Sequence, residues 1–288
     1  MSQLRKIRYR LFSWRWFPEL QAAPDEIDVV IPIIAKDLRI LPLCLEGIRQ
    51  CVAHPIKQIY IVAPSQPEII AFCDEYHLQF VDETSVFGFG PKDLKLQIDI
   101  PNGILDRSGW LFQQLVKLSG RVGTCQHYLC IDADHVLVRP HVFLTTTGET
   151  VFYMSYEEHQ PYYDNIRQLM PGLPLDNLSY VAHKMLFDKE QLALLHQTLG
   201  ERSGGDWVKT IVSNYDHQQF AGFSEFEIYG NFVKDKVRRP WLQKRLPYKK
   251  LADYETLCKR WSGSRWSLTF PDYMRQNQQM LKEEGDSL

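Results

Sequence analysis

The sequence lacks the features that would place the protein in a membrane, outside the cell or on a nucleic acid. No apolar run among its 288 residues reaches the roughly 18 that a bilayer-spanning helix needs. The six cysteines are scattered and form no C-x-x-C pair, which argues against a zinc site or a disulfide scaffold and for reduced thiols in the cytoplasm. With 33 lysines and arginines against 35 aspartates and glutamates, the net charge of -2 predicts no nucleic acid partner.

The first 24 residues are basic, yet they lack the uninterrupted apolar stretch of a signal peptide. Leu4, Ile7, Leu11 and Trp14 recur at helical spacing, with most of the basic residues elsewhere on the helical wheel. The pattern predicts an amphipathic helix that either lies on an anionic membrane surface or packs its apolar stripe on the domain. The first alternative would make the protein peripheral at the inner face of a membrane.

From residue 25 onward, short apolar runs alternate with helical patterns, and no internal repeat is present. Strands are predicted at Ile27–Pro32, Ile59–Pro64, Leu78–Val81, Tyr128–Ile131, Thr150–Ser155 and Leu178–Phe187. Helices are predicted at Leu41–Val52, Pro67–Tyr76, Ser108–Ser119, Lys189–Leu199 and Trp207–Val212. The alternation predicts an α/β fold with a mixed, mostly parallel sheet flanked by helices. We expect a single domain over residues 25–245, with halves 25–140 and 141–245, and a C-terminal extension over 246–288.

Two carboxylates interrupt the buried run Y-L-C-I-D-A-D-H-V-L-V-R-P at residues 128–140. Asp132 and Asp134 follow four apolar residues, so we expect them at the carboxyl edge of the sheet, where such folds bind ligands. Period-two alternation points both to one side, and Mg²⁺ or Mn²⁺ would relieve their mutual repulsion. His135 points to the opposite face and is not expected to bind the same ion. The structural alternative is a surface turn that follows a strand.

One family with such a motif is the haloacid-dehalogenase-like phosphohydrolases, which residues 131–137 resemble. There Asp132 would be the nucleophile and Asp134 the general acid and base. That motif normally ends the first strand of its fold, whereas three predicted strands precede it here. The later acidic pair of that family is also absent from the sequence.

Over residues 28–232 the chain resembles the GT-A glycosyltransferases. The resemblance depends on the opening strand D-V-V-I-P-I, the motif C-I-D-A-D-H-V-L-V-R-P and the late segment F-S-E-F-E-I-Y-G-N-F. Together with G-W-L-F-Q-Q-L-V-K-L, these segments look like a poorly characterised bacterial family of GT-A-type proteins. The resemblance implies transfer of a sugar from a nucleotide-diphosphate sugar to a hydroxyl of a glycan or a lipid-linked acceptor. A binding protein that keeps the fold without catalysis is the remaining alternative.

The resemblance also implies roles for particular residues. Asp132 and Asp134 would hold a divalent metal on the diphosphate of the donor, and Lys36 and Asp37 would lie close to its base and ribose. A divalent cation and basic side chains stabilise the negative charge that develops on the leaving diphosphate. Lys117 is one candidate for such a side chain, and its alternative is a lysine on the helix surface.

Further candidates for donor binding lie on the helix at residues 108–119 and in the basic stretch 234–250. Trp110, Gln113 and Gln114 would frame the donor, although Trp110 is explained equally well by packing of the helix on the sheet. The basic stretch holds eight lysines and arginines against one aspartate, and its alternative is a solvated surface.

Transfer to a hydroxyl with inversion requires a general base, and two late carboxylates are candidates. Ser224 and Glu227 match a capping box at the start of a helix, which gives Glu227 a structural alternative. Glu225 has no such alternative and is the preferred base. His183 lies in an apolar strand, where it is a core residue, an acceptor contact or a metal ligand. The aromatic stretch at residues 153–163 contains carboxylates and would suit a sugar, and its alternative is an ordinary loop.

Overall fold

A central sheet of five strands organises the computed structural model, which describes residues 20–271 apart from 102, 156, 177, 202, 235–237, 243–244 and 248–251. The strand order is β3-β2-β1-β6-β9, parallel except for the last pair, β6 and β9. The strands are β1 (Ile27–Pro32), β2 (Ile56–Ala63), β3 (Gln79–Asp82), β6 (His127–Ile131) and β9 (Lys184–Asp188). The mixed, mostly parallel sheet and the single domain that the sequence predicts are confirmed.

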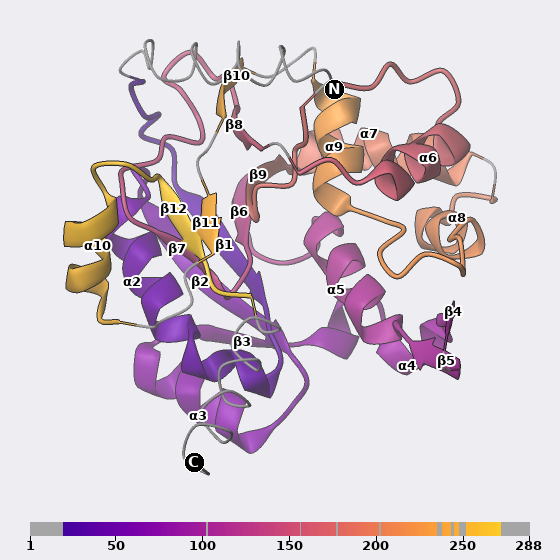
Figure 1. Cartoon of the computed structure of the whole chain (residues 1–288), viewed down its shortest axis with the longest axis horizontal. Helices are drawn as coiled ribbons and strands as arrows, with labels where there is room; N and C mark the ends of the chain where they lie inside the picture. The colour runs from indigo at the N-terminus through magenta and orange to yellow at the C-terminus, as the bar shows by residue number, and fades with distance from the viewer. Residues whose placement is uncertain are drawn as a thin grey trace, which may run out of the picture.

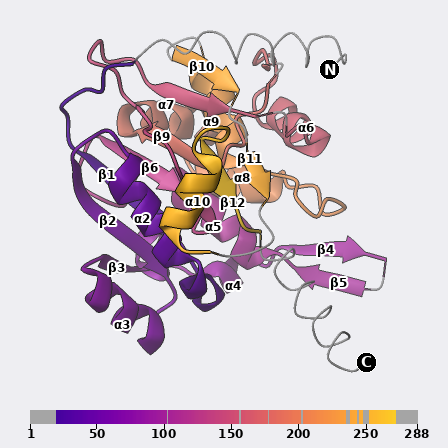
Figure 2. The ribbon, with the colours of Figure 1, turned by 60° about the vertical axis from the view of Figure 1, so that its left-hand side comes forward.

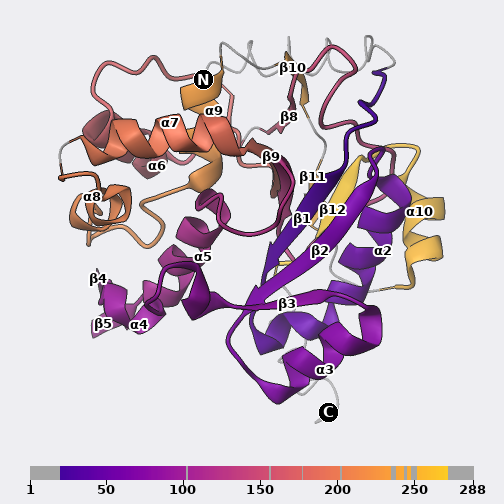
Figure 3. The same ribbon diagram turned by 180° about the vertical axis from the view of Figure 1, so that it is seen from behind.

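Helices cover both faces of this sheet, as Figures 1 and 3 show from opposite sides. One face carries α2 (Leu41–Cys51), α3 (Pro67–Tyr76) and, further out, α10 (Tyr254–Trp261). The other face carries α5 (Ser108–Leu118), α6 (Gln160–Leu169), α7 (Lys189–Gly200), α8 (Trp207–Ser213) and α9 (Glu225–Val233). Alternate residues of the strands therefore enter two cores, so that Val29 packs toward α2 and Val30 toward α5.

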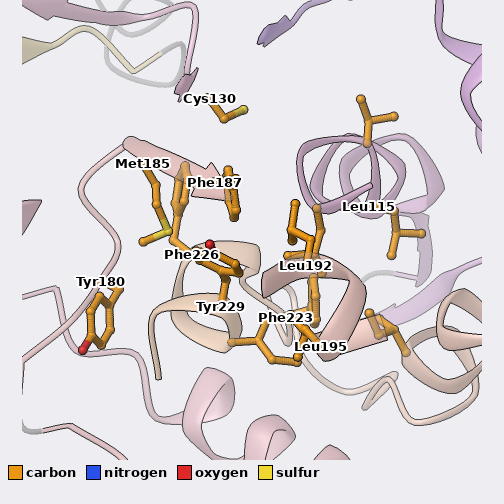
Figure 4. Close-up of a cluster of buried hydrophobic side chains, with 14 of the residues drawn as sticks. Leu115, Cys130, Tyr180, Met185, Phe187, Leu192, Leu195, Phe223, Phe226 and Tyr229 are labelled. Carbon is orange, nitrogen blue, oxygen red and sulfur yellow. The ribbon is translucent and has the colours of Figure 1, made fainter. Parts of the chain in front are cut away.

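The core beneath α7 and α9 is rich in aromatic side chains (Figure 4). Phe187 of β9 lies against Tyr229 of α9, with ring centroids 4.7 Å apart, and the centroid of Phe226 lies 6.4 Å from that of Phe187. The Tyr229 hydroxyl accepts a hydrogen bond from the backbone N–H of Asp188, which satisfies its polar end inside the core. This packing fixes α9 against the strand that ends the sheet.

Smaller sheets surround the central one. A second sheet has the order β11-β12-β7, and here β12 (Ser267–Thr269) runs antiparallel to β7 (His135–Leu137). The other pairs are β8 (Val151–Met154) with β10 (Arg238–Leu242) and β4 (Gln97–Ile100) with β5 (Gly103–Asp106), and β11 spans Arg245–Pro247. The β4–β5 hairpin projects from the body of the molecule (Figure 2). Short helical turns complete the chain: η1 (Ala35–Arg39), η2 (Glu83–Val86) and α4 (Pro91–Leu94).

The predicted strand Leu178–Phe187 is wrong in its first half. Ordered pairing in β9 begins only at Lys184, because His183 adopts a left-handed backbone with φ of 59°, which an extended strand cannot contain. The residues before it turn away, and Ser179 bridges to Ser155 instead.

Two further expectations concern the membrane. The predicted N-terminal amphipathic helix falls almost wholly on residues 1–19, which lie outside the described residues. Within the part of the chain that the structure describes, no helix combines the length and the apolar character that crossing a bilayer requires.

All six cysteines are free thiols.

Candidate active site

A cleft of about 770 Å³ crosses the carboxyl ends of the parallel strands. Its lining includes Pro32, the last residue of β1, Pro64 after β2 and the Asp132–Asp134 segment after β6. The predicted donor and metal residues all line it: Lys36, Asp37, Trp110, Gln113, Gln114, Lys117, Asp132, Asp134 and His183. Parallel strands expose their carboxyl ends at one edge, which is why segments distant in sequence converge here.

Three of these residues form a cluster that fits a divalent cation. One ligand atom each from Asp132, Asp134 and His183 lies within 4.8 Å of the others. Two carboxylate oxygens and an imidazole nitrogen suit Mn²⁺, and the carboxylates alone suit Mg²⁺. The antiparallel pairing of β6 with β9 produces the cluster, because it sets His183 opposite Asp132, whose backbone N–H donates to the His183 carbonyl at 3.0 Å.

Asp132 is held from two directions. Its Oδ1 accepts from the Lys117 ammonium at 2.6 Å, and its Oδ2 is 2.7 Å from Nδ1 of His183. Burial alone would raise the pKa of Asp132, but Lys117 and His183 hold that pKa well below its ordinary value. The carboxylate is therefore ionised at neutral pH and available to a cation.

Lys117 is a buried residue, and the surface lysine considered from the sequence is ruled out. Its ammonium bridges Asp132 and Glu225, the latter at 2.9 Å, and lies 5.0 Å from the centroid of the Phe226 ring. Burial opposes its charge, yet the two carboxylates raise its pKa above the ordinary value. A lysine in this position fixes one carboxylate of the cluster and brings positive charge to the cleft.

Glu225 and Glu227 do not line the cleft, so the base roles expected from the sequence need correction. Glu225 is 1% exposed and faces Lys117 from the far side, where burial raises its pKa. Glu227 is fully buried and accepts hydrogen bonds from Ser179 and from the backbone N–H of Tyr180. Burial raises the pKa of Glu227 to about 7. The packing of the helix turns both carboxylates into the core, and neither lines the cleft.

Of the capping box predicted at the start of α9, the half that Ser224 contributes is present. The Ser224 side chain accepts a hydrogen bond from the backbone N–H of Glu227 at 3.3 Å, which starts the helix. The Glu227 carboxylate instead turns toward the segment before β9.

His183 combines backbone strain with contacts to two carboxylates. A left-handed backbone at a residue other than glycine costs about 1–3 kcal/mol and persists where surrounding structure imposes it. Its Nε2 lies 3.8 Å from a carboxylate oxygen of Glu157, which also lines the cleft. The core-residue alternative for His183 is therefore wrong, since 21% of its side chain is exposed to the cleft.

The helix α5 supplies one wall of the cleft. Trp110 meets Tyr215 edge to face at 6.3 Å, and the Arg107 guanidinium lies 4.6 Å from the centroid of the indole. Gln114 is 8% exposed and donates to the Trp110 carbonyl. Trp110 thus both packs against Tyr215 and lines the cleft, so the two explanations that the sequence left open are compatible.

Two charged residues of the lining, Glu83 and Arg107, are not among the candidates from the sequence. Glu83 follows β3, and the rule that ligands meet the carboxyl ends of strands would have drawn attention to it. Arg107 precedes α5 and stacks on Phe220 at 4.0 Å from the ring centroid. That contact joins segments more than a hundred residues apart, and no local pattern signals it.

The described features define a mostly parallel α/β protein with a carboxylate–histidine cluster at the ends of its strands. Comparison with known families is more specific: the model for a family of unknown function, DUF6492, matches residues 25–261. The chain belongs to this family. No curated protein matches the chain.

Several solved structures are similar to the chain at low identity. An active-site mutant of LgtC is 12% identical, with 85% of this chain and 87% of that chain covered and a TM-score of 0.47. Mouse xyloside xylosyltransferase 1 in its apo form is 10% identical, with coverage of 87% and 99% and a TM-score of 0.48. The galactosyltransferase LgtC with donor and acceptor sugar analogs is 12% identical, with coverage of 85% and 87% and a TM-score of 0.45. Similarities this weak carry no argument about activity, which has to come from this protein's own residues.

Proposed function

We propose that the protein is a metal-dependent GT-A glycosyltransferase that moves a sugar from a nucleotide-diphosphate sugar to a hydroxyl of a glycan or a lipid-linked acceptor. The observation that carries the proposal is the cluster of Asp132, Asp134 and His183 at one end of a cleft that crosses four strand ends. A cleft of this volume holds a small-molecule ligand, and the cluster supplies the site for its charged part.

The residues of the cluster would hold Mn²⁺ or Mg²⁺, which would neutralise the charge that develops on a leaving diphosphate. The protein's own groups contribute in two ways. Lys117 keeps Asp132 ionised and oriented through the bond to Oδ1. Lys36 and Arg107 add positive charge to the lining, where phosphate oxygens need it.

On the acceptor side, Glu157 replaces Glu225 and Glu227 as our candidate base. Its carboxylate lines the cleft, is 40% exposed and lies beside the metal-facing His183. A base has to lie within hydrogen-bond reach of the acceptor hydroxyl, and among the three glutamates only Glu157 opens to the cleft.

The phosphohydrolase alternative gains no support from the geometry. In that family the aspartate motif ends the first strand of the fold, whereas Asp132 follows β6, and β1, β2 and β3 of the same sheet precede it in the chain. We also propose that the protein acts in the cytoplasm, where its free cysteines stay reduced. A contact of the basic N-terminal segment with an anionic membrane stays a prediction.

The test is calorimetric titration of the full chain with UDP, GDP and their sugars in the presence of Mn²⁺, and then with EDTA. We expect metal-dependent binding of one nucleotide, and we expect Asp134→Ala to weaken it by about a hundredfold, because one of three ligands is lost. Asp74→Ala, which removes an exposed carboxylate of α3, is the matched control and should bind as the wild type does.

Three results would count against the proposal. If Asp134→Ala and the wild type bind the nucleotide equally tightly, the cluster is not the site of the cation. A phosphoenzyme formed on Asp132 would support the hydrolase. Binding without turnover of any nucleotide sugar, across glycan and lipid-linked acceptors, would leave a non-catalytic binding protein.

A further inference from the structure

The far end of the cleft carries a glutamate whose carboxylate has no protein partner among the described residues. Glu83, the first residue of η2, is 9% exposed and lines the cleft. Among the described residues, no group forms a hydrogen bond or an ion pair with its side chain. Burial and the neighbouring charge of Asp82 raise the pKa of Glu83. Neither of its carboxylate oxygens is both fully shielded and unpartnered, so they remain open to the cleft and can accept hydrogen bonds from a ligand there.

The adjacent aspartate shows what a structural carboxylate looks like in this turn. Asp82 accepts from the hydroxyl of Ser65 and from both the backbone N–H and the hydroxyl of Thr84. These bonds lower the pKa of Asp82. The turn therefore uses Asp82 for its own capping and leaves Glu83 to the cleft.

The register of the sheet sets the distance from Glu83 to the metal cluster. The pairs Val30↔Cys130, Pro32↔Val62 and Ala63↔Asp82 keep the strands in step, so Glu83 comes close to level with Asp134. Three strand spacings separate β3 from β6, which amounts to about 14 Å. That span matches the reach of an extended nucleoside diphosphate from the edge of its base to its terminal phosphate.

If the diphosphate lies at Asp132 and Asp134, the ribose lies over β1 and β2 and the base reaches Glu83. The base of the nucleotide then decides which sugar donor fits beside Glu83.

The four bases differ in the hydrogen-bonding groups along their edges. Uracil presents one N–H between two carbonyl oxygens, and adenine and cytosine each present an amino group beside an acceptor nitrogen. In a planar pair with a carboxylate, each of these bases would place an acceptor atom, a carbonyl oxygen or a ring nitrogen, opposite one of the two carboxylate oxygens, and two acceptors repel. Guanine alone presents two adjacent donors, N1–H and the 2-amino group, which match both oxygens of a carboxylate.

We propose that Glu83 recognises the guanine edge and that the sugar donor is a guanosine diphosphate sugar. The inference rests on the proposed function, because it takes the diphosphate to lie at the metal cluster. It makes Glu83 the residue that determines nucleotide specificity.

The experiment titrates the full chain with GDP, IDP, 2′-deoxy-GDP and UDP in the presence of Mn²⁺. IDP lacks only the 2-amino group, so the wild type should bind it about ten- to a hundredfold more weakly than GDP. Glu83→Gln should lose this preference and bind GDP no more tightly than IDP. Glu68→Gln, which changes an exposed glutamate of α3, should retain the preference. The thermal midpoint of Glu83→Gln should equal or exceed that of the wild type, which verifies that the variant is folded.

The results that would overturn the role of Glu83 differ from those that would overturn the proposed function. Metal-dependent binding that favours UDP, or that does not distinguish GDP from IDP, overturns the role of Glu83 and leaves the proposed function standing. Equal weakening of GDP and IDP by Glu83→Gln, with weak binding of 2′-deoxy-GDP by the wild type, overturns it in favour of a ribose contact. Failure of every nucleotide to bind overturns the proposed function as well.

Discussion

At the scale of single residues, the site depends on an arrangement in which one lysine serves two carboxylates. The Lys117 ammonium contacts Asp132 on the cleft side and Glu225 on the core side. Removing one partner from such a buried set leaves an uncompensated charge, and that costs more than the set itself contributes. Glu225 thus contacts Lys117, which in turn contacts Asp132 and lines the cleft.

We therefore expect Lys117→Met to lower the free energy of unfolding by about 3 kcal/mol, because the buried Glu225 and the partly buried Asp132 lose their counterion. Adding Glu225→Gln should restore part of the loss, since one of the two charges is removed. Urea denaturation measures both effects. Lys209→Met, at an exposed lysine of α8, is the control and should change stability by less than about 0.5 kcal/mol. A loss below about 1 kcal/mol for Lys117→Met would show that the cluster tolerates the missing charge.

At the scale of elements, α9 shows how one helix can place charged groups in a core. Its Ser224 cap starts the helix, and its inward face presents Glu225 toward Lys117 and Glu227 toward Ser179. A residue without a side chain lets α9 approach the segment before β9, because a Cβ on Gly230 would overlap the ring of Tyr180. That close approach supports the backbone that leads to His183.

Two glycines in helices allow a matched test of this packing. Gly230→Ala should destabilise the protein by about 1–3 kcal/mol, because overlap with Tyr180 outweighs the better helix propensity of alanine. Gly109→Ala in α5 should stabilise the protein or leave it unchanged, because an added Cβ there meets no atom within 4 Å. Thermal and urea unfolding measure both. A stabilised Gly230→Ala variant would mean that the Tyr180 ring can move aside.

At the scale of the whole molecule, the C-terminal region completes the site. The backbone N–H of Phe270 donates to the Asp134 carbonyl at 2.9 Å, and Thr269 contacts the His135 ring at 3.0 Å. His135 itself is fully buried and does not line the cleft, and its ring stacks on that of His183 with centroids 5.6 Å apart. The strand β12 lies beyond the part of the chain that the family model matches, yet it pairs with β7, which directly follows Asp134.

Leu268→Ala tests this long-range support. Leu268 is fully buried against Val136, so we expect a loss of about 2–5 kcal/mol in the free energy of unfolding. We also expect affinity for Mn²⁺ to fall by about tenfold, since the backbone that carries Asp134 loses support. Calorimetric titration with Mn²⁺ alone measures the second effect. Leu194→Ala, at a leucine that is 44% exposed, should change neither quantity. Reduced stability with unchanged Mn²⁺ affinity would make β12 structural only.

The sequence by itself determined the features that depend on short-range pattern. Apolar runs and helical spacing located β1, α3 and α7 within a residue, because burial imposes a period on neighbouring positions. The same reasoning placed Asp132 and Asp134 at the carboxyl edge of the sheet, since they directly follow the apolar run of β6. Their metal-binding role stays a prediction.

Only the tertiary structure decided which distant side chains meet. The pairing of β6 with β9 brought His183 to Asp132, and the packing of α5 on α9 joined Lys117 to Glu225. Glu225 and Glu227 entered the core although the sequence suggested a role in catalysis. Such contacts depend on strand register and helix orientation, which the folded molecule settles by the total of its packing. No local pattern carries that information, and for this reason the partners of each charged residue emerged only in three dimensions.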